Sequence, residues 1–115
     1  MGLPDTDVAR IEKYCSDASS PEHVDIARIE CEVKGSTVTI VEATRMSPER
    51  GGEWLRVPAA RLRHDATAGE WTLYCFDHDS RAVRYDLWDP DFVQPGTVEG
   101  ILDEIEADPT DIFWG

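Results

Sequence analysis

The residues best suited to chemistry gather in and just after one predicted hairpin. His78 stands between Asp77 and Asp79, and Asp89 follows further along the chain. Carboxylate oxygens suit hard cations such as Mg²⁺ or Mn²⁺, and an ion held there would make the domain a small metal-assisted hydrolase. The spacing matches neither a calcium-binding loop nor a zinc signature. Asp and Ser side chains also bond to their own backbone in turns, so a structural turn explains this run more simply.

Nucleophilic catalysis has little support in the sequence. The GxSxG motif is absent, and Cys15, Cys31 and Cys75 lie in apolar patterns, where a thiol ionises poorly. An odd number of cysteines without CxxC pairs is typical of reduced core residues in a cytoplasmic protein. The pair Gly51-Gly52 lacks the lysine that follows in a phosphate-binding loop. We therefore expect a domain that is not an enzyme and needs no cofactor.

A second candidate surface combines aromatic rings with arginines. The chain has four tryptophans, and both faces of one predicted strand are apolar, although two helices can cover only one face. We expect an exposed binding or dimer surface formed by Trp54, Tyr74, Arg84 and Tyr85, with the loop around Arg50 as a further contact. The alternative is that the apolar segment Phe113-Trp114 folds back over the second face and closes it.

The positions of these candidate residues depend on the hairpin over residues 69–88. We expect the rest of the chain to be organised around this hairpin. Side chains alternate in a strand, so residues 70–76 place Trp71, Leu73 and Cys75 on one side and Thr72, Tyr74 and Phe76 on the other. Residues 77–80 reverse the chain, and residues 82–87 return as a strand with Val83 and Tyr85 in phase. The pattern predicts a central strand followed by its partner.

The other elements follow from periodicity and from turn residues. We predict a first helix over residues 6–16 capped by Asp5 or Thr6, and a last helix capped by Thr97 and stopped by Asp108-Pro109. Strands are predicted over residues 24–33, 37–43 and 54–64. A break in alternation at Ala27-Arg28 predicts a β-bulge in the first strand, and Pro58 predicts an edge or bulge in the third.

Charge narrows the classes of partner. The chain has 24 acidic residues and 11 lysines or arginines, a formal net charge of −13. Such a balance argues against binding nucleic acid or an anionic membrane, since both require clustered bases. It fits a surface adapted for solubility, or an acidic inhibitor that mimics nucleic acid. No apolar run is long enough to span a membrane, and the start of the chain lacks the features of a secretory signal.

Several residues spread along the chain resemble one family. They are Trp71-Thr72-Leu73-Tyr74, Tyr85, Leu102-Asp103-Glu104-Ile105, Asp108-Pro109 and the closing Ile112-Phe113-Trp114-Gly115. Together they resemble a small bacterial domain-of-unknown-function family, number 3024, over nearly the whole chain. The sequence departs from that family at Val83-Arg84, where a Trp-His type of pair is expected. The resemblance implies a shared fold and supplies no activity, substrate or partner.

The sequence therefore predicts one α+β domain over residues 1–115. Its expected architecture is a single antiparallel meander sheet of about five strands with an N-terminal and a C-terminal helix packed on it. The expected function is a non-catalytic protein-binding or assembly module in the cytoplasm, joined to another protein or to a second copy of itself. The alternatives are the metal-assisted hydrolase using Asp77, His78, Asp79 and Asp89, and the acidic inhibitor.

Overall fold

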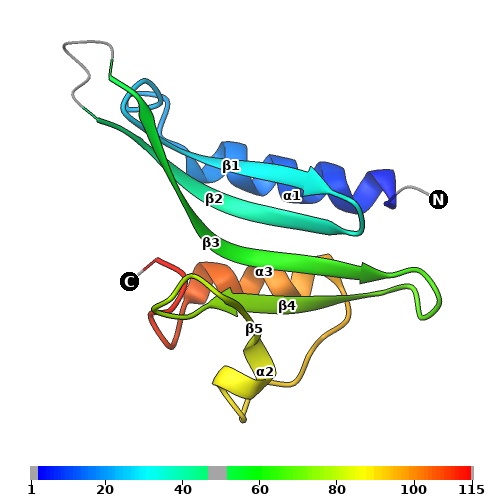
Figure 1. Cartoon of the computed structure of the whole chain (residues 1–115). Coiled ribbons are helices and arrows are strands. Elements are labelled where there is room, and N and C mark those ends of the chain that lie inside the picture. The colour runs from blue at the N-terminus through cyan, green and yellow to red at the C-terminus, as the bar shows by residue number, and fades with distance from the viewer. Residues whose placement is uncertain (1–2, 47–51, 115) are drawn as a thin grey trace.

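The computed structural model describes residues 3–46 and 52–114, and its centre is a five-stranded antiparallel sheet in the order β1-β2-β3-β4-β5. The strands are β1 (Ala27–Lys34), β2 (Thr37–Arg45), β3 (Trp54–Asp65), β4 (Glu70–Phe76) and β5 (Ala82–Arg84), and the helices are α1 (Asp5–Ala18), α2 (Tyr85–Trp88) and α3 (Val98–Ala107). Both long helices lie on the same side of the sheet (Figure 1). The predicted α+β meander with two covering helices is confirmed.

The core lies between the sheet and these two helices. It contains Ile11 and Cys15 from α1 and three residues of α3, Val98, Ile101 and Ile105, packed on the inward side chains of β2, β3 and β4. Those inward side chains are Val38, Ile40, Ala60, Leu62, Trp71, Leu73 and Cys75. The apolar side chains that alternate along the strands and those at helical spacing in α3 therefore form one apolar layer.

The cysteines are free, as expected. Cys15 and Cys75 are buried and Cys31 is half-buried. Burial raises the pKa of the Cys15 thiol to about 12 and that of Cys75 to about 11, so neither is an activated nucleophile.

The cap prediction holds for the last helix and fails for the first. The Thr97 hydroxyl accepts the N–H of Gly100, which satisfies one of the free donors at the start of α3. At α1 the capping residue is Pro4, and no side chain closes the helix. Neither Asp5 nor Thr6 caps it, because the helix begins one residue earlier than predicted and includes both.

The irregularities of the sheet differ from those predicted. No bulge occurs at Ala27-Arg28, because β1 begins only at Ala27 and the residues before it form turns. The bulge lies in β3, where Ile40 pairs with Ala60 but Val41 pairs with Pro58, which leaves Ala59 as the extra residue. The missing N–H of Pro58 is thus accommodated at a break in the ladder, as its position predicted.

The predicted central hairpin is only partly formed. β3 is the middle strand, and β4 pairs with β5 over just three residues, from Tyr74 with Arg84 to Phe76 with Ala82. The predicted return strand over residues 82–87 is wrong beyond Arg84, because the chain turns there into α2 and buries Tyr85. This leaves the first half of β4 paired with β3 but without a strand on its outer side.

A loop residue completes the outer edge of β4. The Gln94 side-chain oxygen accepts the N–H of Leu73 at 2.9 Å, and its amide nitrogen donates to the Leu73 carbonyl at 3.1 Å. The N–H of Trp71 bonds the carbonyl of Gly96 at 2.8 Å. The segment that leads to α3 therefore supplies the hydrogen bonds of a missing strand.

Candidate functional site

The Asp-His-Asp run forms a turn. The Asp77 carboxylate accepts the backbone N–H groups of Asp79 and Arg81 at 2.9 and 3.0 Å, and the Arg81 side chain bonds Asp77 and Asp79. These backbone donors, together with Arg81, hold the pKa of the Asp77 carboxyl below its usual range. The carboxylates proposed as metal ligands are thus engaged in shaping the hairpin.

The rest of the proposed metal site is dispersed. The His78 ring packs edge-on near Trp88, with 6.5 Å between ring centroids, and Asp89 accepts the N–H of Asp91. Among the residues that the structure describes, no group of three His, Cys, Asp or Glu side chains is placed to hold a metal ion.

The other candidate surface lies on the side of the sheet opposite the helices, which we call the open face. Strand register aligns Glu32, Thr39, Arg61, Tyr74 and Arg84 in one row across all five strands. Directly opposed residues of an antiparallel sheet point to the same side, so these five share the open face. No helix among the described residues lies over it (Figure 1).

Three of the five predicted binding residues lie on this face. Tyr74 and Arg84 belong to the row, and Trp54 lies on the same face at the far end of β3, beneath the Arg28 guanidinium at 4.0 Å. Tyr85 was predicted to be exposed and is fully buried, since it follows the end of β5 and turns into the core. Arg50 lies outside the described residues.

Apart from Arg84, sequence analysis missed the bases of the open face. At least six of the chain's eleven bases lie there, on β1, β3 and β5. They are Arg28, Lys34, Arg56, Arg61, Arg63 and Arg84. The alternation of charge along β1 and β3 was a visible signal, but only the position of the helices shows that this side is left open.

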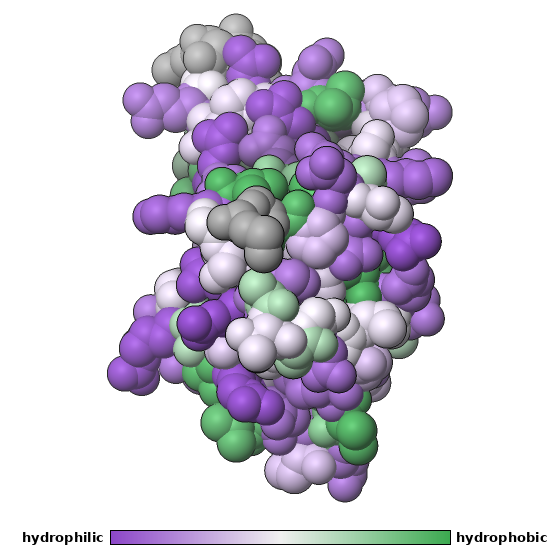
Figure 2. Space-filling view, turned by 90° about the vertical axis from the view of Figure 1, so that its right-hand side faces the viewer, coloured by the Kyte–Doolittle hydropathy of each residue, from purple (hydrophilic) through white to green (hydrophobic). Residues whose placement is uncertain are grey.

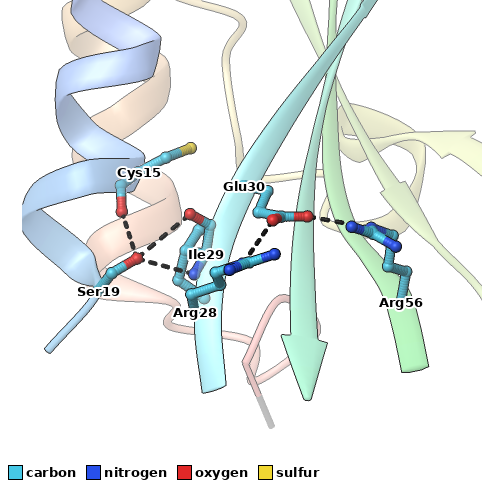
Figure 3. Close-up of polar contacts among 6 residues, drawn as sticks. All are labelled: Cys15, Ser19, Arg28, Ile29, Glu30 and Arg56. Carbon is cyan, nitrogen blue, oxygen red and sulfur yellow. Dashed lines mark hydrogen bonds and ion pairs between the residues drawn. The ribbon is translucent and has the colours of Figure 1, made fainter. Parts of the chain in front are cut away.

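Half of these bases are paired with carboxylates. Glu30 lies between Arg28 and Arg56 and accepts a hydrogen bond from each, at 2.6 and 3.0 Å (Figure 3). Burial acts to raise the pKa of Glu30, but the two arginines outweigh it and hold the pKa below its usual range. Arg84 pairs with Asp86 at 2.9 Å.

The other three bases have no such partner. Among the described residues, no carboxylate lies within ion-pair distance of Lys34, Arg61 or Arg63. Arg61 donates instead to the Thr39 hydroxyl at 3.0 Å and lies over the Phe76 ring at 5.2 Å. Its stem helps to bury Thr39, which is only 8% exposed although it points away from the core.

The open face has two shallow hollows. One, of about 300 Å³, is lined on β1, β2 and β3 by residues that include Lys34, Thr39 and Arg61. The other, of about 380 Å³, is lined by residues that include Arg63 and Tyr74. Their lining combines bases, hydroxyl groups and an aromatic ring with the carboxylates of Glu32 and Asp65. The bases outnumber the carboxylates, which suits recognition of an anionic group more than transformation of a substrate.

A model of the family described as "Domain of unknown function (DUF3024)" matches residues 3–115. The chain belongs to the DUF3024 family. No curated protein and no solved structure matches it. In this DUF3024 chain, no helix among the described residues is long and apolar enough to cross a membrane.

The closing motif of the DUF3024 chain is docked on the helix side of the sheet. The Asp108 carboxylate accepts the N–H groups of Phe113 and Trp114, both at 3.0 Å, and the Trp114 indole donates to the Ile105 carbonyl. Phe113 is 6% exposed and packs against Tyr85. The segment is therefore docked, but on the helix side, so the alternative that it folds back over the second face is wrong and the open face stays uncovered.

Proposed function

We propose that this DUF3024 domain is a non-catalytic protein-binding module whose contact surface is the open face of the sheet. The observation that carries the proposal is the row from Glu32 to Arg84, which crosses five strands without a helix above it. A layered domain normally covers both apolar faces of a sheet or leaves one face polar. Here the second face holds aromatic rings beneath arginines, the residue types that anchor protein interfaces.

The size of this surface is adequate for a specific contact. The five strands, about 4.8 Å apart, form a plane roughly 20 Å wide. This plane tapers, because β2 pairs with β3 over nine residues but β4 pairs with β5 over only three. The side chains standing on it expose more area than the plane itself, which brings it toward the roughly 800 Å² that one partner buries in a standard interface. Figure 2 views the molecule from the side, at 90° to Figure 1, and there apolar residues form only small separate patches between hydrophilic ones.

Tyr74 is the anchor that we propose to test. It is half-buried between Arg61 and Arg84 in the row, so an aromatic contact there would be flanked by two bases. Tyr74→Ala should keep the far-ultraviolet circular dichroism of the parent and lose co-purifying proteins that mass spectrometry finds with the unchanged domain. Light scattering on the same samples reports whether that partner is a second copy.

A matched control lies on the other side of the sheet. Val57 is 49% exposed near the start of β3 but points to the helix side. Val57→Ser should retain every partner that Tyr74→Ala loses. Loss of the partner with Val57→Ser alone would place the contact on the helix side and contradict the proposal, as would a monomer that recovers no partner at all.

A further inference from the structure

We infer that the open face recognises an acidic segment of its partner protein, at a cationic site formed by Lys34, Arg61 and Arg63 around Thr37 and Thr39. This inference rests on the proposed function. It specifies which part of the open face binds the partner and which chemical groups make the contact.

Strand register brings the three bases together. Lys34, Thr37, Arg63 and Thr72 form the row next to the one that contains Thr39 and Arg61. Neighbouring rows on one face are about 7 Å apart and neighbouring strands about 5 Å apart, so extended side chains from β1 and β3 reach one site above β2. Of the two hollows described above, one lies beside Lys34 and Arg61 and the other beside Arg63.

The three bases remain available to a ligand. Glu30 and Asp86 engage the other open-face arginines and not these three bases. Glu32 and Asp65 line the same two hollows without pairing with the three bases. The site thus keeps one net positive charge on a chain whose formal net charge is −13.

Carboxylates are the anions that fit this site best. An arginine fork matches a carboxylate with two parallel hydrogen bonds, and Arg61 and Arg63 offer two forks. The Thr39 hydroxyl accepts a hydrogen bond from Arg61 and keeps its own proton for a ligand oxygen.

Two other occupants fit less well. A nucleic acid brings one charge per phosphate, and a chain with 24 acidic residues repels such a polyanion at long range. A second copy docking open face to open face would set bases against bases, because a two-fold interface pairs each patch with itself. A protein segment with a few acidic residues avoids both costs.

The test uses the full chain and a fluorescent peptide of about twelve residues in which Glu alternates with Thr. Fluorescence anisotropy should show binding that weakens as salt is raised, because ion pairs at a surface are screened. The same peptide with Gln in place of Glu should not bind. Arg63→Gln and Lys34→Gln, whose side chains are exposed, should each weaken binding by about tenfold, the scale of one charged hydrogen bond.

Matched controls are bases outside the open face. Lys13→Gln and Arg81→Gln remove one positive charge each, from pairs with Asp17 and Asp77. They should leave peptide affinity within about twofold, after correction for the overall charge. Equal losses in all four variants would show a non-specific charge effect and overturn the inference.

Other outcomes also overturn it. No binding of the Glu peptide at low salt, or tighter binding of an oligothymidylate of similar length that the same substitutions abolish, would exclude an acidic protein segment. If Tyr74→Ala loses the cellular partner while Lys34→Gln and Arg63→Gln keep it, the open face is still the contact surface and only this inference fails.

Discussion

The Trp71 indole donates a hydrogen bond to the Asp7 carboxylate at 2.8 Å, which links β4 to the first turn of α1 across 64 positions of sequence. Trp71 is 2% exposed, so its N–H requires a partner that the apolar core cannot offer. Asp7 also lies at the positive end of the helix dipole, where a carboxylate is favourable. One side chain therefore satisfies a buried donor and stabilises the helix start.

Asp7→Ala should lower the free energy of unfolding by about 2 kcal/mol, because it leaves the indole N–H buried without an acceptor. Asp5→Ala is the control, since Asp5 is exposed in the same helical turn and shares the dipole effect alone. Urea titrations followed by Trp fluorescence measure both. If the two variants lose the same stability, the indole bond contributes nothing beyond the charge.

Ser19 closes the outer edge of β1. Its hydroxyl oxygen accepts the N–H of Ile29 at 2.8 Å, and its proton is shared between the carbonyls of Cys15 and Ile29 at 2.9 and 3.2 Å (Figure 3). Edge strands with free N–H and C=O groups are templates for pairing with another chain. Ser19 thus joins the end of α1 to the edge and blocks it at one position.

Ser19→Ala should cost about 1–2 kcal/mol of stability and increase aggregation during storage, as the Ile29 groups lose their partner. Ser16→Ala is the matched control on the exposed side of α1, and it should change stability by less than about 0.5 kcal/mol. Chemical denaturation gives the first quantity and light scattering over time the second. Identical behaviour of the two variants would show that the Ser19 bonds are dispensable.

The sequence predicted α3 and most of the sheet because their signals are local. Thr97, the spacing of Val98, Ile101 and Ile105, and the stop at Asp108 all act within the helix itself. The position of Tyr85 depends on distant residues. It continues the alternation of Val83, yet its ring packs between Phe92 and Phe113, with centroids 4.8 and 5.0 Å away. Burial against those segments outweighed the strand pattern.

For the candidate surface too, local signals were visible in the sequence and the effect of distant packing was not. Alternation in β3 indicated that Arg61 and Arg63 share one face and that Leu62 points to the other. It did not indicate which face the helices cover, since that is decided by the packing of Ile11 and Ile101 on the sheet. Tyr74 lies on the face opposite Leu73, as alternation predicted, because residues 70–76 form the expected strand.

Gly100 is required in α3 although glycine weakens a helix. A Cβ at this position would meet the Pro95 ring at 2.7 and 2.9 Å, closer than real contacts allow. Gly100→Ala should therefore reduce stability by about 1 kcal/mol, although alanine in a helix interior normally gains about that amount. Asp103→Ala, at an exposed position of the same helix, should be neutral or slightly stabilising. Thermal melts followed by circular dichroism decide it, and a stabilised Gly100→Ala would contradict the proposed clash.

The Tyr85 hydroxyl is one source of pH dependence in the core. It donates to the Glu104 carboxylate at 2.8 Å and lies 3.1 Å from the Thr110 hydroxyl. Burial raises the pKa of Tyr85 from 10.0 to about 12, with the bond to Glu104 acting in the same direction and the bond to Thr110 against it. Because the folded state holds this proton more tightly than the unfolded state, the associated stability is complete below pH 10 and is lost as the pH approaches 12.

Tyr85→Phe should therefore lose about 1 kcal/mol of unfolding free energy at pH 7, where the hydroxyl bonds are intact. Above pH 10 the unchanged protein should lose stability more steeply than the variant, because only its unfolded state can ionise this phenol, and the two stability curves should converge. Urea titrations at pH 7, 9 and 10.5 measure the gap. Tyr74→Phe is the control for removing a phenolic hydroxyl, since the tyrosine hydroxyls that bond described residues are those of Tyr14 and Tyr85, and at pH 7 it should leave stability near that of the parent. A Tyr85→Phe gap that is constant across this range would show that the folded and unfolded states hold the phenolic proton equally well, and that burial beside Glu104 has no influence on it.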